Sequence, residues 1–163
     1  MTTEPIALPP SACRVKEAAE ELGLAIVVQV MREPTRTAEQ AAAACGCAVA
    51  QIVKSLVFAG EESGRPYLLL VSGQNRVDER SVAAALGEPL ARLDAERVRA
   101  LTGFAIGGIP PFGHASPLPV YMDQDLLAFD SVWAAAGTPF AVFSVSPEAL
   151  AQAVGARAIR VTG

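Results

Sequence analysis

Two stretches of the chain carry residue types that are unusual for their surroundings and could do chemistry. The first is Lys54, inside the apolar segment Gln51–Ala59 (QIVKSLVFA). The segment is rich in β-branched residues and predicts a strand, whose side chains alternate between two faces. Lys54 then shares a face with Ile52 and Leu56, where an ammonium group is costly unless it is paired or reaches water. Lys54 is either a ligand for an anionic group such as a phosphate or a strand-edge lysine that extends into solvent.

The second stretch is residues 106–114, IGGIPPFGH. Glycines let a backbone approach a ligand closely, and prolines remove donors while leaving carbonyl groups free to accept. The stretch lacks the lysine of a Walker loop and the glycine spacing of a dinucleotide-binding loop. It is therefore either a loop that presents backbone groups to a small ligand or a tight connector between two strands.

His114, at the end of this stretch, is the only histidine in the chain. It is either an acid, base or donor near a substrate, or a structural histidine bonded to backbone. A serine–histidine–aspartate triad would have to use His114, but the chain has no G-x-S-x-G elbow. The sequence therefore offers no convincing nucleophile–base pair.

Four arginines fall in predicted loops or helix caps and, together with Lys54, could bind the phosphates of a nucleic acid. The alternative for each arginine singly is a solvated charged surface. The four are Arg32, Arg36, Arg76 and Arg80.

The three cysteines, Cys13, Cys45 and Cys47, do not form a metal-ligand pattern with the one histidine. Their odd number and the absence of a secretion signal predict reduced thiols and a cytoplasmic protein. We expect no metal and no other cofactor.

Short helices and short strands intersperse along the chain, which predicts an α/β or α+β fold with a mixed, barrel-like sheet surrounded by short helices. Cap residues and glycines predict helices over Ser11–Gly23, Thr37–Gly46, Asp78–Gly87 and Asp94–Gly103, and a fifth starting at Ser146. Apolar, β-branched runs predict strands over Leu24–Met31, Gln51–Ala59, Pro66–Val71, Leu118–Met122, Leu127–Val132, Phe140–Val145 and Arg157–Val161.

Composition bounds the class of protein. The chain has 163 residues, 52% of them hydrophobic and 18% charged, with a net charge of −4. These values predict a single folded domain over 1–163, with residues 1–10 as a poorly ordered tail. No apolar run approaches the roughly 20 residues of a membrane-spanning helix, so we expect no membrane contact. The acidic balance argues against a general DNA or RNA coat protein, and no DNA partner is expected.

Taken in order, several segments resemble the YbaK/prolyl-tRNA synthetase-associated editing domains. TRTAEQAAAACGCAVAQIVKSLVF is similar to the family's helix and lysine-bearing strand, and LLLVSGQNRVDERSVAAALG to the strand, turn and helix that follow. LTGFAIGGIPPFGH resembles the family's glycine–proline substrate loop, and AGTPFAVFSVSPEAL its closing strand and helix. The resemblance spans about Val15 to Val161, and the joint occurrence of KSLVF and GGIPPFGH makes it specific.

The resemblance implies a free-standing hydrolase that cleaves the ester of a mischarged aminoacyl-tRNA, most readily a tRNA(Pro) carrying a small amino acid such as alanine. It implies a catalytic role for Lys54 toward the terminal phosphate or ribose. It implies a substrate-binding loop, for which we expect Gly107, Gly108, Ile109, Pro111, Phe112 and His114, although His114 falls where family members vary. The implied partners are aminoacyl-tRNA and prolyl-tRNA synthetase. The alternative is a non-catalytic tRNA-binding or synthetase-associated regulatory domain of the same fold.

Overall fold

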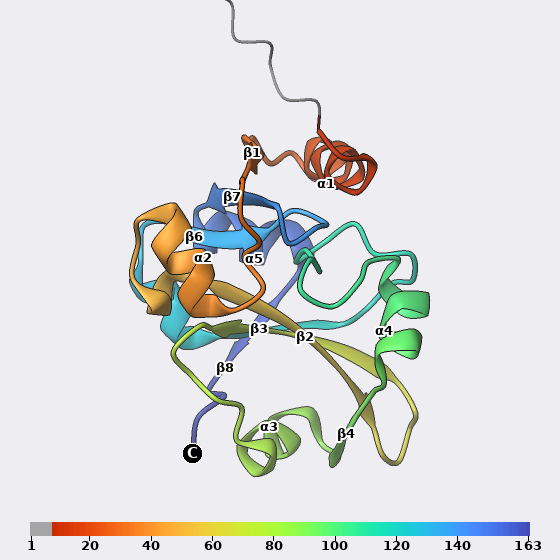
Figure 1. The fold of residues 1–163 in the computed structure, drawn as a ribbon. Helices are drawn as coiled ribbons and strands as arrows, with labels where there is room; N and C mark the ends of the chain where they lie inside the picture. The colour runs from red at the N-terminus through yellow and green to blue at the C-terminus, as the bar shows by residue number, and fades with distance from the viewer. Residues whose placement is uncertain (1–7) are drawn as a thin grey trace, which may run out of the picture.

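The computed structural model describes residues 8–163, and within them the chain forms five α-helices and two β-sheets (Figure 1). The helices are α1 (Pro10–Glu21), α2 (Ala38–Cys45), α3 (Glu79–Leu86), α4 (Ala95–Thr102) and α5 (Pro147–Val154). The strands are β1 (Gln29–Val30), β2 (Val53–Gly60), β3 (Pro66–Ser72), β4 (Leu90–Arg92), β5 (Val120–Asp123), β6 (Val132–Ala135), β7 (Ala141–Val145) and β8 (Arg157–Ile159).

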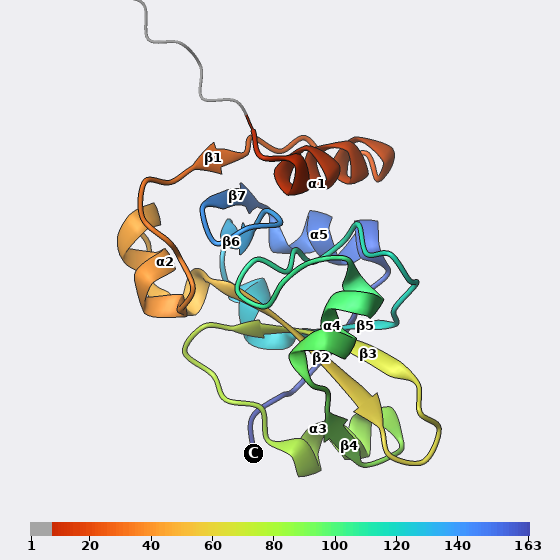
Figure 2. The ribbon, with the colours of Figure 1, turned by 45° about the vertical axis from the view of Figure 1, so that its right-hand side comes forward.

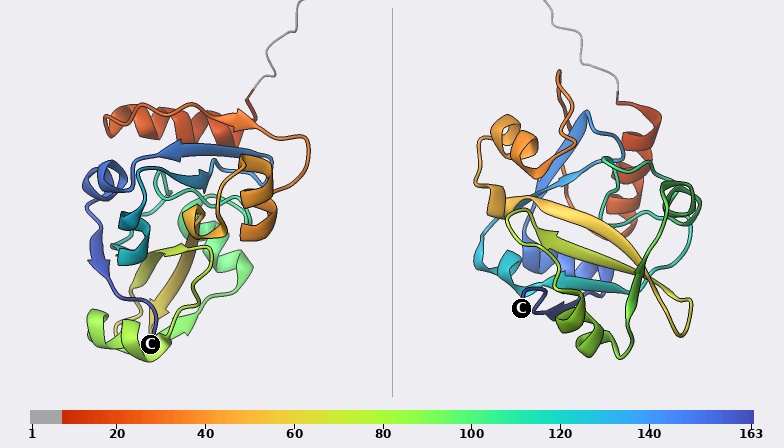
Figure 3. Two further views of the ribbon diagram at one scale, coloured as in Figure 1. Left: turned by 90° about the vertical axis from the view of Figure 1, so that its left-hand side faces the viewer. Right: turned by 60° about the horizontal axis from the view of Figure 1, so that its bottom comes forward.

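The larger sheet has the strand order β4-β2-β3-β5-β8 and is mixed. Strand β2 pairs antiparallel with β3 and β4, whereas β3–β5 and β5–β8 are parallel. The β2–β3 hairpin dominates this sheet and extends beyond it as a loop (Figure 3, right). This agrees with the predicted α/β class and mixed sheet.

The smaller sheet has the order β1-β7-β6 and is antiparallel. A single bridge, Ile52 to Trp133, links it to the larger sheet. The two sheets lie in different layers and do not close into a barrel among the described residues (Figures 1 and 2). Helix α1 covers the smaller sheet, and α3 lies at the opposite end of the molecule beside β4 (Figure 2).

Helix boundaries follow the capping residues that the sequence shows. Thr37 accepts a hydrogen bond from Gln40 N–H and completes a capping box at the start of α2. The side chains of Asp78, Asp94 and Ser146 likewise accept N–H groups of the first turn and so cap α3, α4 and α5. Only the start of α1 differs from the prediction: Pro9 is the N-cap and Pro10 opens the helix, because proline has the helical φ preset at this position. Ser11 therefore lies inside α1.

Two strand predictions are wrong in extent. Only Gln29 and Val30 of the predicted strand Leu24–Met31 pair with β7; the rest has no partner strand, and Val27 is 77% exposed. The predicted strand Leu127–Val132 starts within a 3₁₀ turn, Gln124–Ala128, continues as a bend and reaches strand β6 only at Val132. The Asp123 side chain caps the turn by accepting Asp125 N–H. Because β propensity mainly reports a half-buried surface, an apolar run alone does not supply a partner strand. The short strand β4 was not predicted.

Two main clusters of buried side chains lie on opposite faces of the β2–β3 hairpin. Val53, Val57, Leu68 and Leu70 belong to the larger cluster. Their alternate neighbours, including Phe58, Leu69 and Val71, belong to a second cluster that includes Val82 of α3. Strand β2 is thus packed on both faces, which fixes the direction of each of its side chains.

The predicted tail, residues 1–10, lies mostly outside the described residues, which begin at Leu8, and Pro10 is already helical. Among the helices of the described chain, none has both the length and the apolar character needed to cross a bilayer.

Candidate functional site

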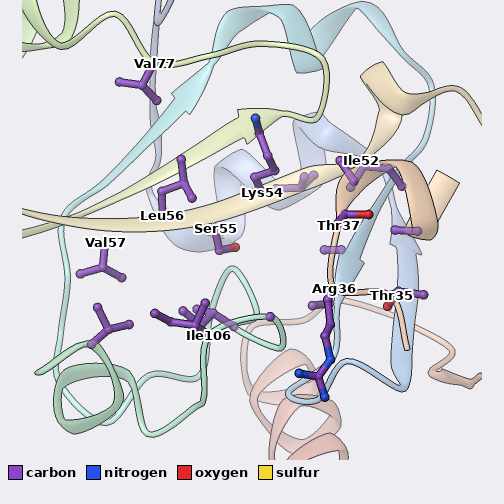
Figure 4. A pocket seen from close by; sticks show the side chains of 18 of the residues that line it. Thr35, Arg36, Thr37, Ile52, Lys54, Ser55, Leu56, Val57, Val77 and Ile106 are labelled. Atoms are coloured by element: carbon purple, nitrogen blue, oxygen red, sulfur yellow. The ribbon is translucent and has the colours of Figure 1, made fainter. Parts of the chain in front are cut away.

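A cavity of about 850 Å³ lies beside strand β2 (Figure 4). Its wall comes from β2, from the segment that leads into α2, from the turns before α3 and α4, from the 106–109 part of the glycine–proline loop, and from β6. The volume falls in the range of about 300–1,000 Å³ typical of small-molecule sites. Lys54 and the front of the glycine–proline loop, which are far apart in the sequence, therefore line the same cavity, with Ile106 of the loop on the side of β2 opposite to the Lys54 side chain (Figure 4).

Lys54 is half-buried in this wall, on the β2 face that also carries Leu56 (Figure 4). Its Nζ donates a hydrogen bond to the main-chain oxygen of Asn75. Burial lowers the pKa of Lys54, Glu39 and Asp123 oppose that effect, and the charge of Arg76 reinforces it. An ammonium group has three N–H donors, so the bond to Asn75 leaves donors for a ligand in the cavity.

Asn75 is itself held by two carboxylates. Its Nδ2 donates to Oδ2 of Asp123 and to Oδ2 of Asp125, each at 2.8 Å. Asp123 is only 1% exposed and also accepts the N–H groups of Ser72 at 3.1 Å and Asp125 at 2.9 Å. This network fixes the carbonyl group that anchors Lys54, so the position of the ammonium group depends on Asp123.

Basic side chains outnumber acidic ones in the lining of the cavity. Arg36, Arg76 and Arg92 line it together with Lys54, whereas Glu79 is the only acidic residue in the described lining. This local balance is opposite in sign to the net charge of −4 for the whole chain, and it favours an anionic ligand.

The four predicted tRNA-binding arginines divide into two pairs. Arg36 and Arg76 line the cavity, while Arg32 and Arg80 are exposed and lie outside its lining. Arg92 was missed by sequence reasoning, and its position at the end of an unpredicted strand explains why. Arg32 and Arg80 remain predictions as tRNA contacts.

The glycine–proline loop is split between the cavity and the core. Gly107 and Ile109 line the cavity, together with the exposed Ile106. Gly107 has a φ of +97°, a conformation that glycine adopts without steric cost. Gly108 instead packs on another loop: a methyl group there would lie 2.6 Å from Cα and 2.7 Å from N of Thr138. Gly108 thus sets the position of the loop through this close backbone contact.

The rest of the loop faces away from Lys54. Pro111, Phe112 and His114 line a separate, smaller pocket of about 260 Å³. Phe112 is buried against Phe143, with ring centroids 5.5 Å apart. The structure therefore does not bring these three predicted substrate-binding residues to the larger cavity.

His114 has a backbone partner, as its structural interpretation requires. Its Nε2 lies 2.7 Å from the carbonyl oxygen of Pro110, and since a carbonyl oxygen only accepts, Nε2 carries the proton. Burial lowers the pKa of His114, and the bond to Pro110 partly opposes that effect. The hydrogen bond from His114 to Pro110 thus stabilises the loop from within, away from the larger cavity.

Ser55 is the second cavity residue that sequence reasoning missed. It follows Lys54 on β2, and its buried hydroxyl oxygen has no hydrogen-bond partner among residues 8–163. A serine within an apolar strand gives no signal in the sequence, because serine is common on half-buried faces. In the described part of the chain, no group of three or more histidine, cysteine, aspartate or glutamate side chains is placed to hold a metal ion.

Comparison with known proteins adds solved structures of the same architecture. One, a candidate trans-editing enzyme for prolyl-tRNA synthetase, is 49% identical, with a TM-score of 0.90 over 96% of this chain and 99% of that one. Another, APE2540, is 31% identical, with a TM-score of 0.85 over 91% of this chain and 98% of that one.

Two proteins are also similar to this chain in sequence. The uncharacterised protein YwhH of Bacillus subtilis (strain 168) is 33% identical over 116 residues, which are 71% of this chain and 73% of YwhH. A proline–tRNA ligase of Limosilactobacillus fermentum is 32% identical over 94 residues, 55% of this chain but only 16% of the ligase. The sequence model of the aminoacyl-tRNA editing domain matches residues 32–153, a range that contains β2, the glycine–proline loop and the whole cavity lining. The chain belongs to the aminoacyl-tRNA editing domain family.

Proposed function

We propose that this protein hydrolyses the ester bond of a mischarged aminoacyl-tRNA as a free-standing, trans-acting enzyme, with tRNA(Pro) carrying a small amino acid such as alanine as its main substrate. The observation that carries the proposal is that Lys54 and the front of the glycine–proline loop both line one cavity of about 850 Å³, on the two sides of strand β2. The solved relative with a trans-editing description supports action in trans on a tRNA for proline.

The cavity has a basic part and an apolar part, and we assign a different part of the substrate to each. Lys54 binds the terminal phosphate or ribose end of the substrate, and Arg36, Arg76 and Arg92 extend this basic region along the approaching tRNA strand. The aminoacyl group enters the apolar part of the cavity, where Val53, Ile109 and other aliphatic side chains form the wall.

Hydrolysis then requires few side chains. A water molecule attacks the carbonyl carbon of the ester, the bond from that carbon to the ribose oxygen breaks, and the ribose oxygen leaves with a proton that comes from the water. No histidine lines the cavity in the described chain, and its one carboxylate is the exposed Glu79. Positioning of the ester and electrostatic stabilisation by fixed donors therefore supply most of the rate gain, and a ribose hydroxyl of the substrate relays the proton.

The apolar wall reads the amino acid mainly by size. One methylene group changes binding by only about 1–3 kcal/mol in such a wall, whereas groups larger than the space are excluded by steric clash. Alanine is therefore the first choice, with serine next, then cysteine and threonine. Proline must be spared, since its release would destroy the correct product.

The test measures release of amino acid from tRNA(Pro) charged with alanine, serine, cysteine, threonine or proline, at equal concentrations and with a chelator present. We expect alanine to be released fastest and proline to be retained. The Lys54→Ala variant should lose at least about tenfold in turnover, equivalent to roughly 1.4 kcal/mol in the transition state.

The panel also separates the alternatives. A protein that binds charged and uncharged tRNA equally and releases no amino acid from any of the five would be the non-catalytic tRNA-binding or regulatory domain. Fast release of proline, or a clear preference for threonine over alanine, would contradict selection by size.

A further inference from the structure

Strand β2 has an unpaired edge, and this edge faces the cavity. Strand β4 pairs only with Phe58–Gly60, at one end of β2. The bridge from Ile52 to Trp133 lies at the other end. Between them, Lys54–Leu56 pairs with a strand only on the β3 side, and these residues, like Val53 and Val57, line the cavity.

The pairing with β3 shows which main-chain groups point to the unpaired edge. Gly73 N–H donates to Ile52 O at 2.8 Å, and Gly60 N–H donates to Arg65 O at 2.9 Å. Even-numbered residues of β2 thus direct their N–H and C=O groups toward β3, and odd-numbered residues direct theirs to the other side. The N–H and C=O groups of Ser55 therefore point away from β3, to the edge where no strand of the described chain pairs with this residue.

The Ser55 side chain adds a third polar group at the same place. Its hydroxyl oxygen is buried and has no hydrogen-bond partner in the described chain. Buried polar atoms are nearly always bonded, so an exception calls for a reason. Figure 4 shows Ser55 and Lys54 leaving β2 on opposite sides, with Ser55 directed toward Ile106 of the glycine–proline loop.

The side chains next to Ser55 on β2 are apolar, and Arg36 also lies on this side of the cavity, beside Gly107. Val53 and Val57 share the Ser55 face of β2 and pack in the larger core cluster with Val98 and Ile109. A charged amino group that enters such surroundings loses its water and must find acceptors there. Ser55 offers two acceptors within one residue, its hydroxyl oxygen and its main-chain carbonyl oxygen.

We propose that Ser55 binds the α-amino group of the aminoacyl moiety through its hydroxyl and main-chain carbonyl oxygens. This inference rests on the proposed function and adds to it the residue that holds the amino acid. The substrate then lies across the edge of β2, with its phosphate beside Lys54 and its amino group beside Ser55. The hydroxyl oxygen is buried as the cavity stands, and rotation about χ1 between staggered positions turns it toward the substrate.

The experiment removes each partner of this contact in turn. Deacylation is measured on alanyl-tRNA(Pro) and on lactyl-tRNA(Pro), in which a hydroxyl group replaces the α-amino group. Ser55→Ala should lower kcat/KM by about tenfold on the alanyl substrate and by less than about twofold on the lactyl substrate. The comparison between variants cancels the intrinsic difference in reactivity between the two esters. Equal loss on both substrates, or no loss on either, would overturn the proposal.

Two controls exclude a structural explanation. Ser55→Ala should keep the wild-type Tm, because the hydroxyl has no partner to lose within the described chain. Ser144→Ala, on β7 and outside the cavity lining, should behave as wild type on both substrates.

A binding measurement separates failure of this proposal from failure of the proposed function. The probes are non-hydrolysable adenosine amides of alanine and of lactic acid, titrated by calorimetry. Wild-type protein should bind the alanine amide more tightly, and Ser55→Ala should remove most of that preference. If the wild type binds with this preference but hydrolyses neither ester, the hydrolase proposal fails and the Ser55 contact stands; if it binds both amides equally, the Ser55 contact fails.

Discussion

Replacing Asp123 by asparagine tests whether the buried carboxylate controls the position and charge of Lys54. Asp123→Asn keeps the size of the side chain and removes its negative charge. That charge raises the pKa of Lys54 against the effect of burial. Asp123 also fixes Asn75, whose carbonyl group anchors the ammonium of Lys54.

The expected loss of stability follows from the bonds that Asp123 accepts. Its Oδ2 accepts from Ser72 N–H and Asn75 Nδ2, and its Oδ1 accepts from Asp125 N–H. Asparagine has only one acceptor oxygen. In the better orientation this oxygen keeps the bonds from Ser72 and Asn75, while the amide NH₂ group faces Asp125 N–H, so the bond from Asp125 is lost. Losing one bond to a charged acceptor at a buried site costs about 1.5–3 kcal/mol. For a domain of this size, that lowers Tm by about 3–12 °C.

The assay combines thermal unfolding with an NMR titration of ¹³C-labelled lysine. The chain has only two lysines, Lys16 and Lys54, so the Lys54→Arg variant assigns both signals. Removing a nearby negative charge disfavours the ammonium form, so the pKa of Lys54 should fall further below its ordinary value of 10.5. Turnover should fall with it, because a neutral amide holds Asn75, and through it Lys54, less firmly than the carboxylate does.

Asp125→Asn is the matched control. Asp125 is exposed and accepts one bond from Asn75, so its loss should cost less than about 1 kcal/mol. Wild-type Tm together with an unchanged pKa of Lys54 in Asp123→Asn would refute the reasoning, and the network would then be incidental to the site.

Three further predictions concern single residues. Gly108→Ala should lower Tm by several degrees, since overpacking against the Thr138 backbone costs about 1–3 kcal/mol; an unchanged Tm would show that the loops separate freely. Binding of tRNA should lose part of its salt dependence in Arg92→Gln, measured as the slope against salt concentration. Bonds from Ser63 and Tyr67 hold the pKa of Glu88 at about 2, so stability should fall as pH drops from about 4.5 toward 2, and Glu88→Gln should flatten that decline in acid melts.

Local signals in the sequence predicted the helices well because capping is local chemistry. Thr37, Asp78 and Asp94 each bond to backbone groups two or three residues further on, and such contacts form whatever the rest of the chain does. The face of Lys54 was likewise predictable from strand alternation alone.

The division of the glycine–proline loop was not predictable in the same way. Its front half lines the cavity, whereas Phe112 and His114 turn into contacts with Phe143 and Pro110. The ring of Phe143 and the carbonyl group of Pro110 determine where these two side chains point, and both contacts depend on the path of the loop. An irregular segment has no periodic pattern from which that path could be predicted. The sequence therefore located the loop but not the direction of its side chains.

The cavity itself depends on where the chain leaves the larger sheet. Strand β4 ends at Arg92 because Asp94 caps α4 and accepts Arg97 N–H at 2.8 Å. Leu93 and Val98 then turn into the cavity wall instead of extending the pairing with β2. The early start of α4 thus leaves Lys54–Leu56 without a paired strand on one side, which is the edge where we propose that Ser55 binds the substrate. Asp94, which caps α4 without lining the cavity itself, is in this sense one of the determinants of the site.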